Sequence, residues 1–259
     1  MSTSVDLQSE LLAVAVRAAR AAGAELMSRW REPHLVETKS TPTDPVSEAD
    51  KAAELAIREV LAETRPDDAI LGEEGGATGH GALRWVVDPL DGTVNYLYGL
   101  TTFAVSIAVE DAAGQLAAVV LDPVHNELFS ATRGGEATRN GHPVKPSGCR
   151  SLDRALVGTG FAYDSAVRVR QAEVAAKIVP LARDIRRAGA AALDMCWCAC
   201  GRLDAYYERG VKAWDIGAGS LICGRAGLEV RTLEAVGELP SGVLVAPAEF
   251  ADQLFLMVA

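Results

Sequence analysis

The chain has 259 residues, of which 49% are hydrophobic and 23% charged, and its formal net charge is −10. This size and composition are typical of a globular protein with one large or two small domains and exclude a disordered chain. The acidic balance argues against binding to nucleic acid or an anionic membrane, and no run of about 18 apolar residues predicts a membrane span. The first ten residues lack the pattern of a signal peptide, so we expect a cytoplasmic protein.

The first part of the chain predicts two helices followed by a sheet. Apolar residues at helical spacing from Leu7 to Trp30 predict a long first helix. A proline-rich stretch over 32–46 predicts a loop, after which Ser47, with Asp50 three residues on, predicts the start of a helix that ends near Thr64. Apolar runs separated by turn residues then predict an antiparallel sheet packed on both helices. Its strands are expected at 69–72, 84–88, 103–110, 116–122 and 128–132.

After about residue 151 strands alternate with helices, which predicts an α/β half. The boundary at 148–153 carries no flexible linker, so we expect two parts, 1–150 and 151–259, packed as one body. The first part would carry the helix pair and the antiparallel sheet. In the second part, strands are expected at 155–159, 184–188, 204–208, 228–233 and 243–246, and helices at 166–182, 190–201, 214–226 and 247–257.

The most informative stretch is Asp88-Pro-Leu-Asp-Gly-Thr93, which follows an apolar strand. Pro89 stiffens the exit from the strand, and Gly92 permits an unusual backbone angle before a short helix near Thr93. Two carboxylates beside exposed N–H groups suit a hard metal ion and a phosphate together. Taken alone, the stretch could also be an ordinary pair of turns. The aspartyl-nucleophile phosphatase motif is excluded because two residues, not one, separate the aspartates.

Two further acidic segments point to the same chemistry. Glu73 follows a short strand inside the Gly72-Glu-Glu-Gly-Gly76 loop, which could bring it to the same metal. Asp215, in Trp214-Asp-Ile-Gly-Ala-Gly219, begins a helix, and helix capping alone would also explain it.

In order and spacing, these motifs resemble the inositol monophosphatase family of magnesium-dependent, lithium-sensitive phosphatases. The resemblance covers nearly the whole chain and includes Lys39 and Asp50 ahead of the acidic motifs. It implies a layered αβαβα sandwich of the inositol monophosphatase and fructose-1,6-bisphosphatase type. Members are usually homodimers, so a homodimer is expected.

The resemblance also implies metal ligands. Glu73, Asp88 and the Leu90 carbonyl would hold a first Mg²⁺, and Asp88, Asp91 and Asp215 a second. A third, weaker ion would share Glu73. Such a cluster would let an acidic chain bind a phosphate dianion, because the ions invert the local field.

Catalytic and substrate roles follow from the same resemblance. Glu73, Thr93 and Asp50 are the implied catalytic residues, with Asp50 hydrogen-bonding the Thr93 hydroxyl that orients the attacking water. Lys39 matches a loop lysine near the metals, and Asn95 is expected to be structural. Substrate contacts are implied for Asp91, Gly92, Thr93, Gly189, Ala191 and Glu208.

Two features lie outside this pattern. Five cysteines, three of them at Cys196, Cys198 and Cys200, are best explained as small, reduced packing residues. The segment between Glu229 and Val243 is shorter than is usual in the family, which leaves the edge of the last sheet open.

The leading hypothesis is therefore a Mg²⁺-dependent phosphomonoesterase acting on inositol monophosphate, a small phosphorylated polyol, with no nucleic-acid or membrane partner. The same scaffold could serve a histidinol-phosphate phosphatase or act on another sugar phosphate. A more distant alternative is a non-catalytic interaction protein, because some relatives are associated with the transcription machinery. The complete set of acidic residues argues against that alternative.

Overall fold

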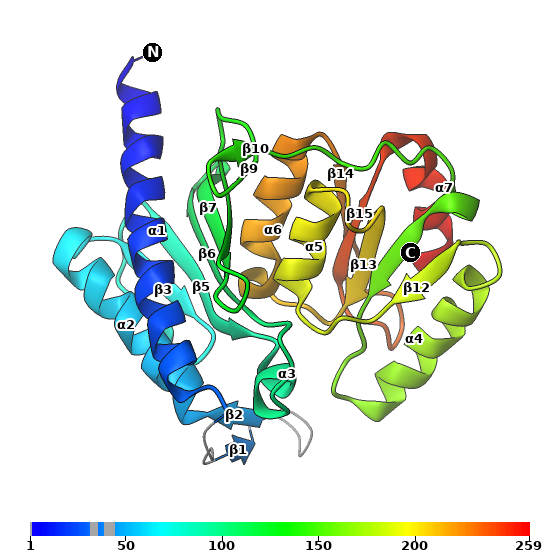
Figure 1. The fold of residues 1–259 in the computed structure, drawn as a ribbon, viewed down its shortest axis with the longest axis horizontal. Helices are drawn as coiled ribbons and strands as arrows, with labels where there is room; N and C mark the ends of the chain where they lie inside the picture. The colour runs from blue at the N-terminus through cyan, green and yellow to red at the C-terminus, as the bar shows by residue number, and fades with distance from the viewer. Residues whose placement is uncertain (1, 32–35, 39–44) are drawn as a thin grey trace.

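The computed structural model describes residues 2–31, 36–38 and 45–259. Its helices are α1 (Ser2–Arg29), α2 (Glu48–Thr64), α3 (Thr93–Leu97), α4 (Ser165–Ile178), α5 (Ala191–Ala199), α6 (Ala213–Ala226) and α7 (Ala248–Val258). Figure 1 shows five layers: the α1–α2 pair, a first sheet, the α5–α6 pair, a second sheet, and the α4 and α7 helices on the far side. The expected αβαβα sandwich is confirmed.

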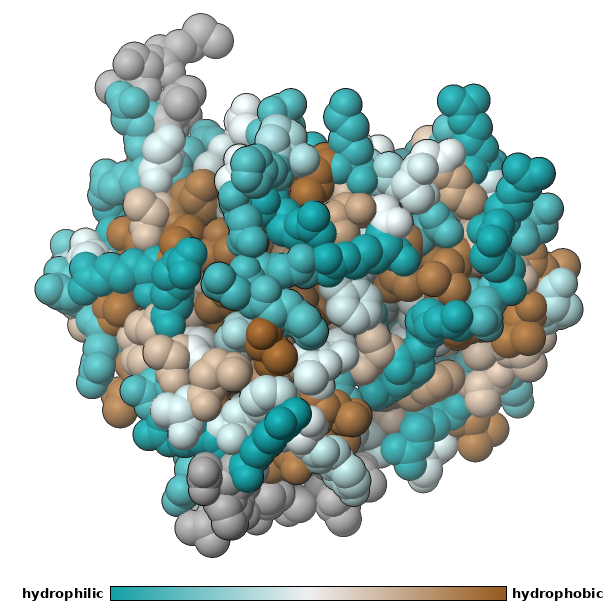
Figure 2. Space-filling view, viewed as in Figure 1, coloured by the Kyte–Doolittle hydropathy of each residue, from teal (hydrophilic) through white to brown (hydrophobic). Residues whose placement is uncertain are grey.

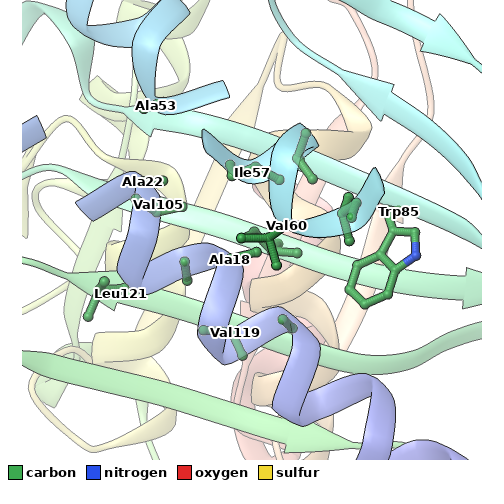
Figure 3. Close-up of a cluster of buried hydrophobic side chains, with 14 of the residues drawn as sticks. Ala18, Ala22, Ala53, Ile57, Val60, Trp85, Val105, Val119 and Leu121 are labelled. Carbon is green, nitrogen blue, oxygen red and sulfur yellow. The ribbon is translucent and has the colours of Figure 1, made fainter. Parts of the chain in front are cut away.

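The first layer forms because both helices carry one apolar face. In α1 the fully buried residues recur at helical spacing from Leu11 through Ala18 to Leu26, and in α2 from Ala53 to Ile57. These faces pack on the first sheet, as Figure 3 shows for Val105, Val119 and Leu121. Burying such aliphatic side chains supplies roughly 25 cal/mol per Å² of apolar area removed from water.

The first sheet has eight strands in the order β10-β9-β8-β7-β6-β5-β3-β4. All neighbours are antiparallel except β3 and β5, which run parallel, so the expectation of a purely antiparallel sheet is wrong at this pair. The cause is the β3–β4 hairpin: β4 occupies the outer edge, and the chain then returns to the inner side of β3. The strands are β3 (Ala69–Gly72), β4 (Gly76–Thr78), β5 (Arg84–Asp91), β6 (Ala104–Asp111), β7 (Gly114–Asp122), β8 (Glu127–Thr132), β9 (Thr138–Arg139) and β10 (His142–Pro143).

The middle layer, α5 and α6, lies between the two sheets and is built from small residues. A Cβ placed on Gly219 would lie 2.8 Å from the Cβ and Sδ of Met195, so only glycine allows the two helices to approach this closely. Cys196, Cys198 and Cys223 are buried free thiols in the same layer. The cysteines therefore act as small packing residues in this layer, as the sequence predicts.

The second sheet has five strands in the order β12-β11-β13-β15-β14, with both parallel and antiparallel neighbours. Its far face is covered by α4 and α7 around a third core that includes Tyr207 and Leu254. The sequence did not predict how the short 229–243 region forms the edge of this sheet. In the structure β14 is the edge strand and pairs with β15 along its whole length. The strands are β11 (Leu156–Thr159), β12 (Asp184–Arg186), β13 (Ala205–Arg209), β14 (Glu229–Leu233) and β15 (Gly242–Ala246).

The predicted elements otherwise occur within a few residues of their predicted limits. Two differences stand out: α4 ends at Ile178 rather than near 182, and the predicted 32–46 loop contains the short antiparallel pair β1 (Val36–Thr38) and β2 (Pro45–Ser47). None of the described helices combines the length and hydropathy needed for a membrane span. Hydrophilic side chains cover most of the face seen in Figure 2, in keeping with the net charge of −10.

Candidate active site

The candidate site is a pocket of about 570 Å³ lined by both sheets and by the middle helices. The first sheet contributes the loop after β3 and the end of β5. The second contributes the end of β13, and the starts of α5 and α6, the segment 161–167 and Pro240 also line the pocket. The predicted site residues in the lining are Glu73, Asp88, Leu90, Asp91, Gly92, Thr93, Gly189, Ala191, Glu208 and Asp215.

The parallel pairing of β3 and β5 brings Glu73 to Asp88. Gly72 lies opposite Val87 in the register, and the Glu73 N–H donates to the Val87 carbonyl at 3.2 Å. Parallel strands end at the same edge of a sheet, so the residues after both strands meet there. Residues 15 positions apart in the sequence thus form one acidic corner.

The end of β5 is irregular, which turns its carboxylates toward the pocket. Pairing with β6 breaks between Asp88 and Asp91, and the Leu90 N–H donates to Asp88 Oδ1 at 3.0 Å. Gly92 follows with a φ of 92°, in the left-handed region, as its predicted role requires. A Cβ there would lie 2.9 Å from the Thr102 carbonyl oxygen, so a larger residue would be both strained and obstructed.

The acids of this corner repel one another. Burial raises the pKa of Asp88 well above its usual range, and the charges of Glu73, Asp91 and Asp215 raise it further. Burial also raises the pKa of Asp91 to about 7, although hydrogen bonds from two N–H groups of α5 act to lower it. Burial raises the pKa of Asp215 as well, and a hydrogen bond from the Lys212 N–H opposes this rise. Such clustering disfavours charge on Asp88, Asp91 and Asp215 until a cation joins them.

The donor set fits Mg²⁺ by its chemistry. Hard carboxylate and carbonyl oxygens are the ligands this ion prefers, and all of them line one pocket. In the described part of the chain, however, no three Asp, Glu, His or Cys side chains already form a metal-binding group. Existing hydrogen bonds explain this: Glu73 bonds with Asp88, and Asp215 Oδ2 accepts from the Lys212 N–H at 2.6 Å.

The predicted contact between Thr93 and Asp50 is present. Thr93 Oγ1 lies 3.1 Å from Asp50 Oδ1 and 3.1 Å from the Leu90 carbonyl oxygen. Asp50 is fully buried in the first turn of α2, behind the pocket rather than in its lining. The hydroxyl of Thr93 therefore stands between the pocket and a buried carboxylate, which is the geometry that water activation needs.

Asp91 joins the first sheet to the middle helix layer. Its Oδ1 accepts the Ala191 N–H at 3.0 Å and its Oδ2 accepts the Ala192 N–H at 2.7 Å, at the start of α5. Each oxygen keeps a further lone pair for a metal ion or a substrate hydroxyl. Asn95 reinforces the junction, since its Nδ2 donates to the Thr102 and Ala188 carbonyls at 2.7 and 2.8 Å. Its predicted structural role agrees with these contacts.

Glu208 lies on the opposite side of the pocket, near the end of β13. Tyr206 donates its hydroxyl to Glu208 Oε2, and a Cβ on Gly160 would lie 2.0 Å from the carboxylate carbon, so Glu208 packs tightly on that glycine. Burial raises the pKa of Glu208, while the hydrogen bond from Tyr206 and the charge of Arg187 lower it. Glu208 is thus held in one position by its hydrogen bond and its packing.

Sequence reasoning missed three residues at this site. Arg187 lines the pocket and faces Glu208 and Asp194, while Asp194 is buried in α5 with its Oδ1 unpartnered. Arg209 follows Glu208 and is also buried. Only the adjacency of Arg209 to Glu208 was visible in the sequence; the other two carry no spacing signal. Lys39 lies outside the described residues.

Comparison with known proteins gives a consistent result. A profile of the inositol monophosphatase family matches residues 7–255. An "Inositol-1-monophosphatase" of Mycobacterium bovis is 44% identical over 230 residues, which are 85% of this chain and 79% of that protein. A "Nus factor SuhB" of Xylella fastidiosa is 39% identical over 225 residues, 85% of this chain and 81% of that protein.

A solved structure extends the comparison to three dimensions. The inositol monophosphatase from Anabaena superposes with a TM-score of 0.83 at 35% identity, covering 97% of this chain and 96% of that one. The profile match spans every described site residue. The chain belongs to the inositol monophosphatase family.

Proposed function

We propose that this protein is a Mg²⁺-dependent phosphomonoesterase that hydrolyses inositol monophosphate to inositol and phosphate. The observation that carries the proposal is the Thr93–Asp50 hydrogen bond beside four acids in one pocket. The names of the M. bovis and Anabaena relatives support the substrate class. We further propose two or three ions: Glu73, Asp88 and the Leu90 carbonyl for the first, Asp88, Asp91 and Asp215 for the second, and Glu73 shared with a third.

When bound, Mg²⁺ supplies electrophilic activation of the phosphate and lowers the pKa of coordinated water. The chain's own residues do the rest. Thr93 Oγ1 holds the attacking water, and Asp50 Oδ1 receives the proton that the water loses through this hydroxyl. The water oxygen forms the new bond to phosphorus on the side opposite the inositol oxygen. The P–O ester bond breaks, and the departing oxygen takes up a proton from solvent to become a hydroxyl, while Asp50 later releases its proton to solvent.

The N–H groups of Gly92 and Thr93 are proposed to hold the phosphate at the start of α3. The ring would lie between Glu208, Asp91 and the backbone of Gly189 and Ala191, all of which line the pocket. The hydrogen bonds from the Ala191 and Ala192 N–H groups to Asp91 would keep the end of β5 and the start of α5 at a fixed distance across the pocket. Fixing the reactants in this way accounts for much of what an enzyme contributes to rate.

One alternative remains within the same chemistry. Glu208 lies near the negative charges of Asp91 and Asp194, and such a wall also suits a cationic amine, as in histidinol phosphate. The assay should therefore measure phosphate release at about pH 8 from inositol 1-phosphate, histidinol phosphate, fructose 1,6-bisphosphate and adenosine 3′,5′-bisphosphate. Each is tested with and without Mg²⁺ and lithium. Preference for histidinol phosphate would keep the mechanism and replace the substrate.

A non-catalytic role is the other alternative, since one relative is named a Nus factor. The absence of a nucleic-acid partner, a cytoplasmic location and a homodimer remain predictions. Failure of all four substrates, with Mg²⁺ present, would reject the phosphatase assignment for these esters and favour an interaction role.

A further inference from the structure

Three segments from different elements meet at one wall of the pocket. Ala162 precedes α4, Gly210 follows β13, and Pro240 precedes β15, and all three line the pocket. A Cβ placed on Gly210 would lie 3.6 Å from the Ala162 Cβ and 3.6 Å from the Pro240 Cγ, which is van der Waals contact. We call this contact the Ala162–Gly210–Pro240 wall. Gly210 of this wall is two residues after Glu208, and both residues line the pocket.

Behind the wall is a buried arginine that no acid neutralises. Arg209 is 4% exposed, its pKa is lowered by burial, and no carboxylate of the described residues pairs with it. Its Nε donates to the Val258 carbonyl at 2.9 Å, and its Nη1 donates to the Glu234 and Pro240 carbonyls, both at 2.8 Å. Burying a guanidinium without a counter-charge costs free energy unless its N–H groups are hydrogen-bonded. The role of Arg209 is therefore to be found in its hydrogen bonds to these three carbonyls.

The main chain at Arg209 reaches the remaining segment. Gln171 Nε2 donates to the Arg209 carbonyl at 3.0 Å, and Gln171 Oε1 accepts the Ala162 N–H at 2.8 Å. The Gly210 N–H donates to the Ser241 carbonyl at 2.8 Å. Through its side chain and its backbone, Arg209 is therefore tied to all three parts of the wall and to the last turn of α7.

We infer that Arg209 is a positioning residue that sets substrate specificity: it holds the 234–241 segment so that Pro240 closes the pocket beside Glu208. The inference rests on the proposed phosphatase function. Arg209 and Glu208 are neighbours on β13 that both line the pocket. The Glu208 side chain accepts the Tyr206 hydroxyl, whereas the Arg209 side chain donates to the Glu234, Pro240 and Val258 carbonyls. Loss of the guanidinium would leave the metal side untouched and loosen the wall that contacts the ring.

The test compares Arg209→Met with Arg231→Met. Arg231 is an arginine of the same sheet whose partners, Glu229 and Asp252, lie outside the pocket. Hydrogen exchange of the 234–241 segment should become faster in Arg209→Met and stay unchanged in Arg231→Met. For inositol 1-phosphate, Arg209→Met should raise KM about tenfold with kcat within about twofold. For glycerol 2-phosphate, which is smaller, kcat/KM should stay within about twofold.

Three outcomes would overturn the inference: unchanged exchange over 234–241, an unchanged KM for inositol 1-phosphate, or equal losses for both substrates. If Arg209→Met does not fold, Pro240→Gly removes the wall directly and must reproduce the selective rise in KM. Absence of phosphate release by the wild type would instead reject the proposed function. The exchange comparison would then decide alone whether Arg209 holds the segment.

Discussion

The two sides of the pocket are built in different ways. On the side of the first sheet, one short stretch from Asp88 to Thr93 supplies most of the functional groups, and one parallel strand pair adds Glu73. On the side of the second sheet, the lining comes from four separated segments near residues 162, 189, 208 and 240. The first side is compact in sequence, and the second is assembled only by folding.

On the proposed function, the first side of the pocket carries out the chemistry and the second side selects the substrate. Most of the groups proposed for metal binding and water activation come from one motif at the end of β5, to which Glu73, Asp215 and Asp50 are added from the ends of β3, α6 and α2. The groups proposed to contact the ring depend on long-range contacts such as Asn95 with Ala188 and Arg209 with Pro240. We therefore expect changes on the first side to lower kcat and changes on the second side to raise KM.

The largest effect is expected from Asp88→Asn. It removes a ligand of both proposed ions, so kcat/KM should fall by roughly 10³-fold or more in a phosphate-release assay with Mg²⁺. Without Mg²⁺ its melting temperature should rise, because one of several mutually repelling buried acids is gone. The matched control is Asp122→Asn, an equally buried aspartate of the first sheet outside the pocket, which should keep kcat within about threefold. Full activity in Asp88→Asn would refute the metal assignment.

The next effect concerns stability and pH in the absence of Mg²⁺. The pKa of Asp91 is about 7 in the folded chain and about 3.8 when unfolded, so the folded state binds more protons between these values. The free energy of unfolding should therefore fall as pH rises from 4 to 7, by at most about 4 kcal/mol from this group. Urea denaturation at several pH values measures the slope. Saturating Mg²⁺ should flatten it, and a rising free energy would contradict the acidic-corner description.

A smaller effect is expected from Thr93→Val, which keeps the shape of the side chain but removes the hydroxyl between Asp50 and the pocket. We expect kcat for inositol 1-phosphate to fall about 10²-fold with KM within about threefold. Thr159→Val is the control, since that threonine of β11 is also buried but lies outside the pocket lining. An increase in KM alone would place Thr93 in binding rather than in water activation.

The smallest effect is expected on the substrate side. Glu208→Gln should raise KM for inositol 1-phosphate about tenfold and change kcat less than about threefold. Glu229→Gln, on the edge strand of the same sheet, should match the wild type in steady-state kinetics. If Glu208→Gln lowered kcat as strongly as Thr93→Val, the division between the two sides would be wrong.

Much of the fold could be predicted from the sequence because its signals are local. Alanine-rich apolar spacing defines α1, and turn residues separate β6, β7 and β8, so these elements lie close to their predicted limits. The parallel pairing of β3 with β5 could not be predicted, because it depends on which side of β3 the returning chain takes. The short pairs β1–β2 and β9–β10 carry too few residues for a periodic signal.

The same division applies to the site. The Asp50–Thr93 bond was expected only from the resemblance to the inositol monophosphatase family, since on its own Asp50 predicts no more than the start of a helix. Arg187, Asp194 and Arg209 were missed, since their relation to the pocket exists only after β12, α5, β13 and the 234–241 segment come together. A sequence pattern of period two or 3.6 reports which face a residue occupies, but not which distant backbone it will contact.

The thin layer of α5 and α6 determines the width of the pocket. Gly219 lies against Met195, and many of the surrounding residues are alanine or cysteine, so small side chains contribute much of the volume that separates the two sheets. An added methyl group in this layer would move the substrate side away from the metal side without altering any residue that touches substrate. Variants that accept bulkier phosphate esters are therefore to be sought between the sheets as well as at the pocket rim.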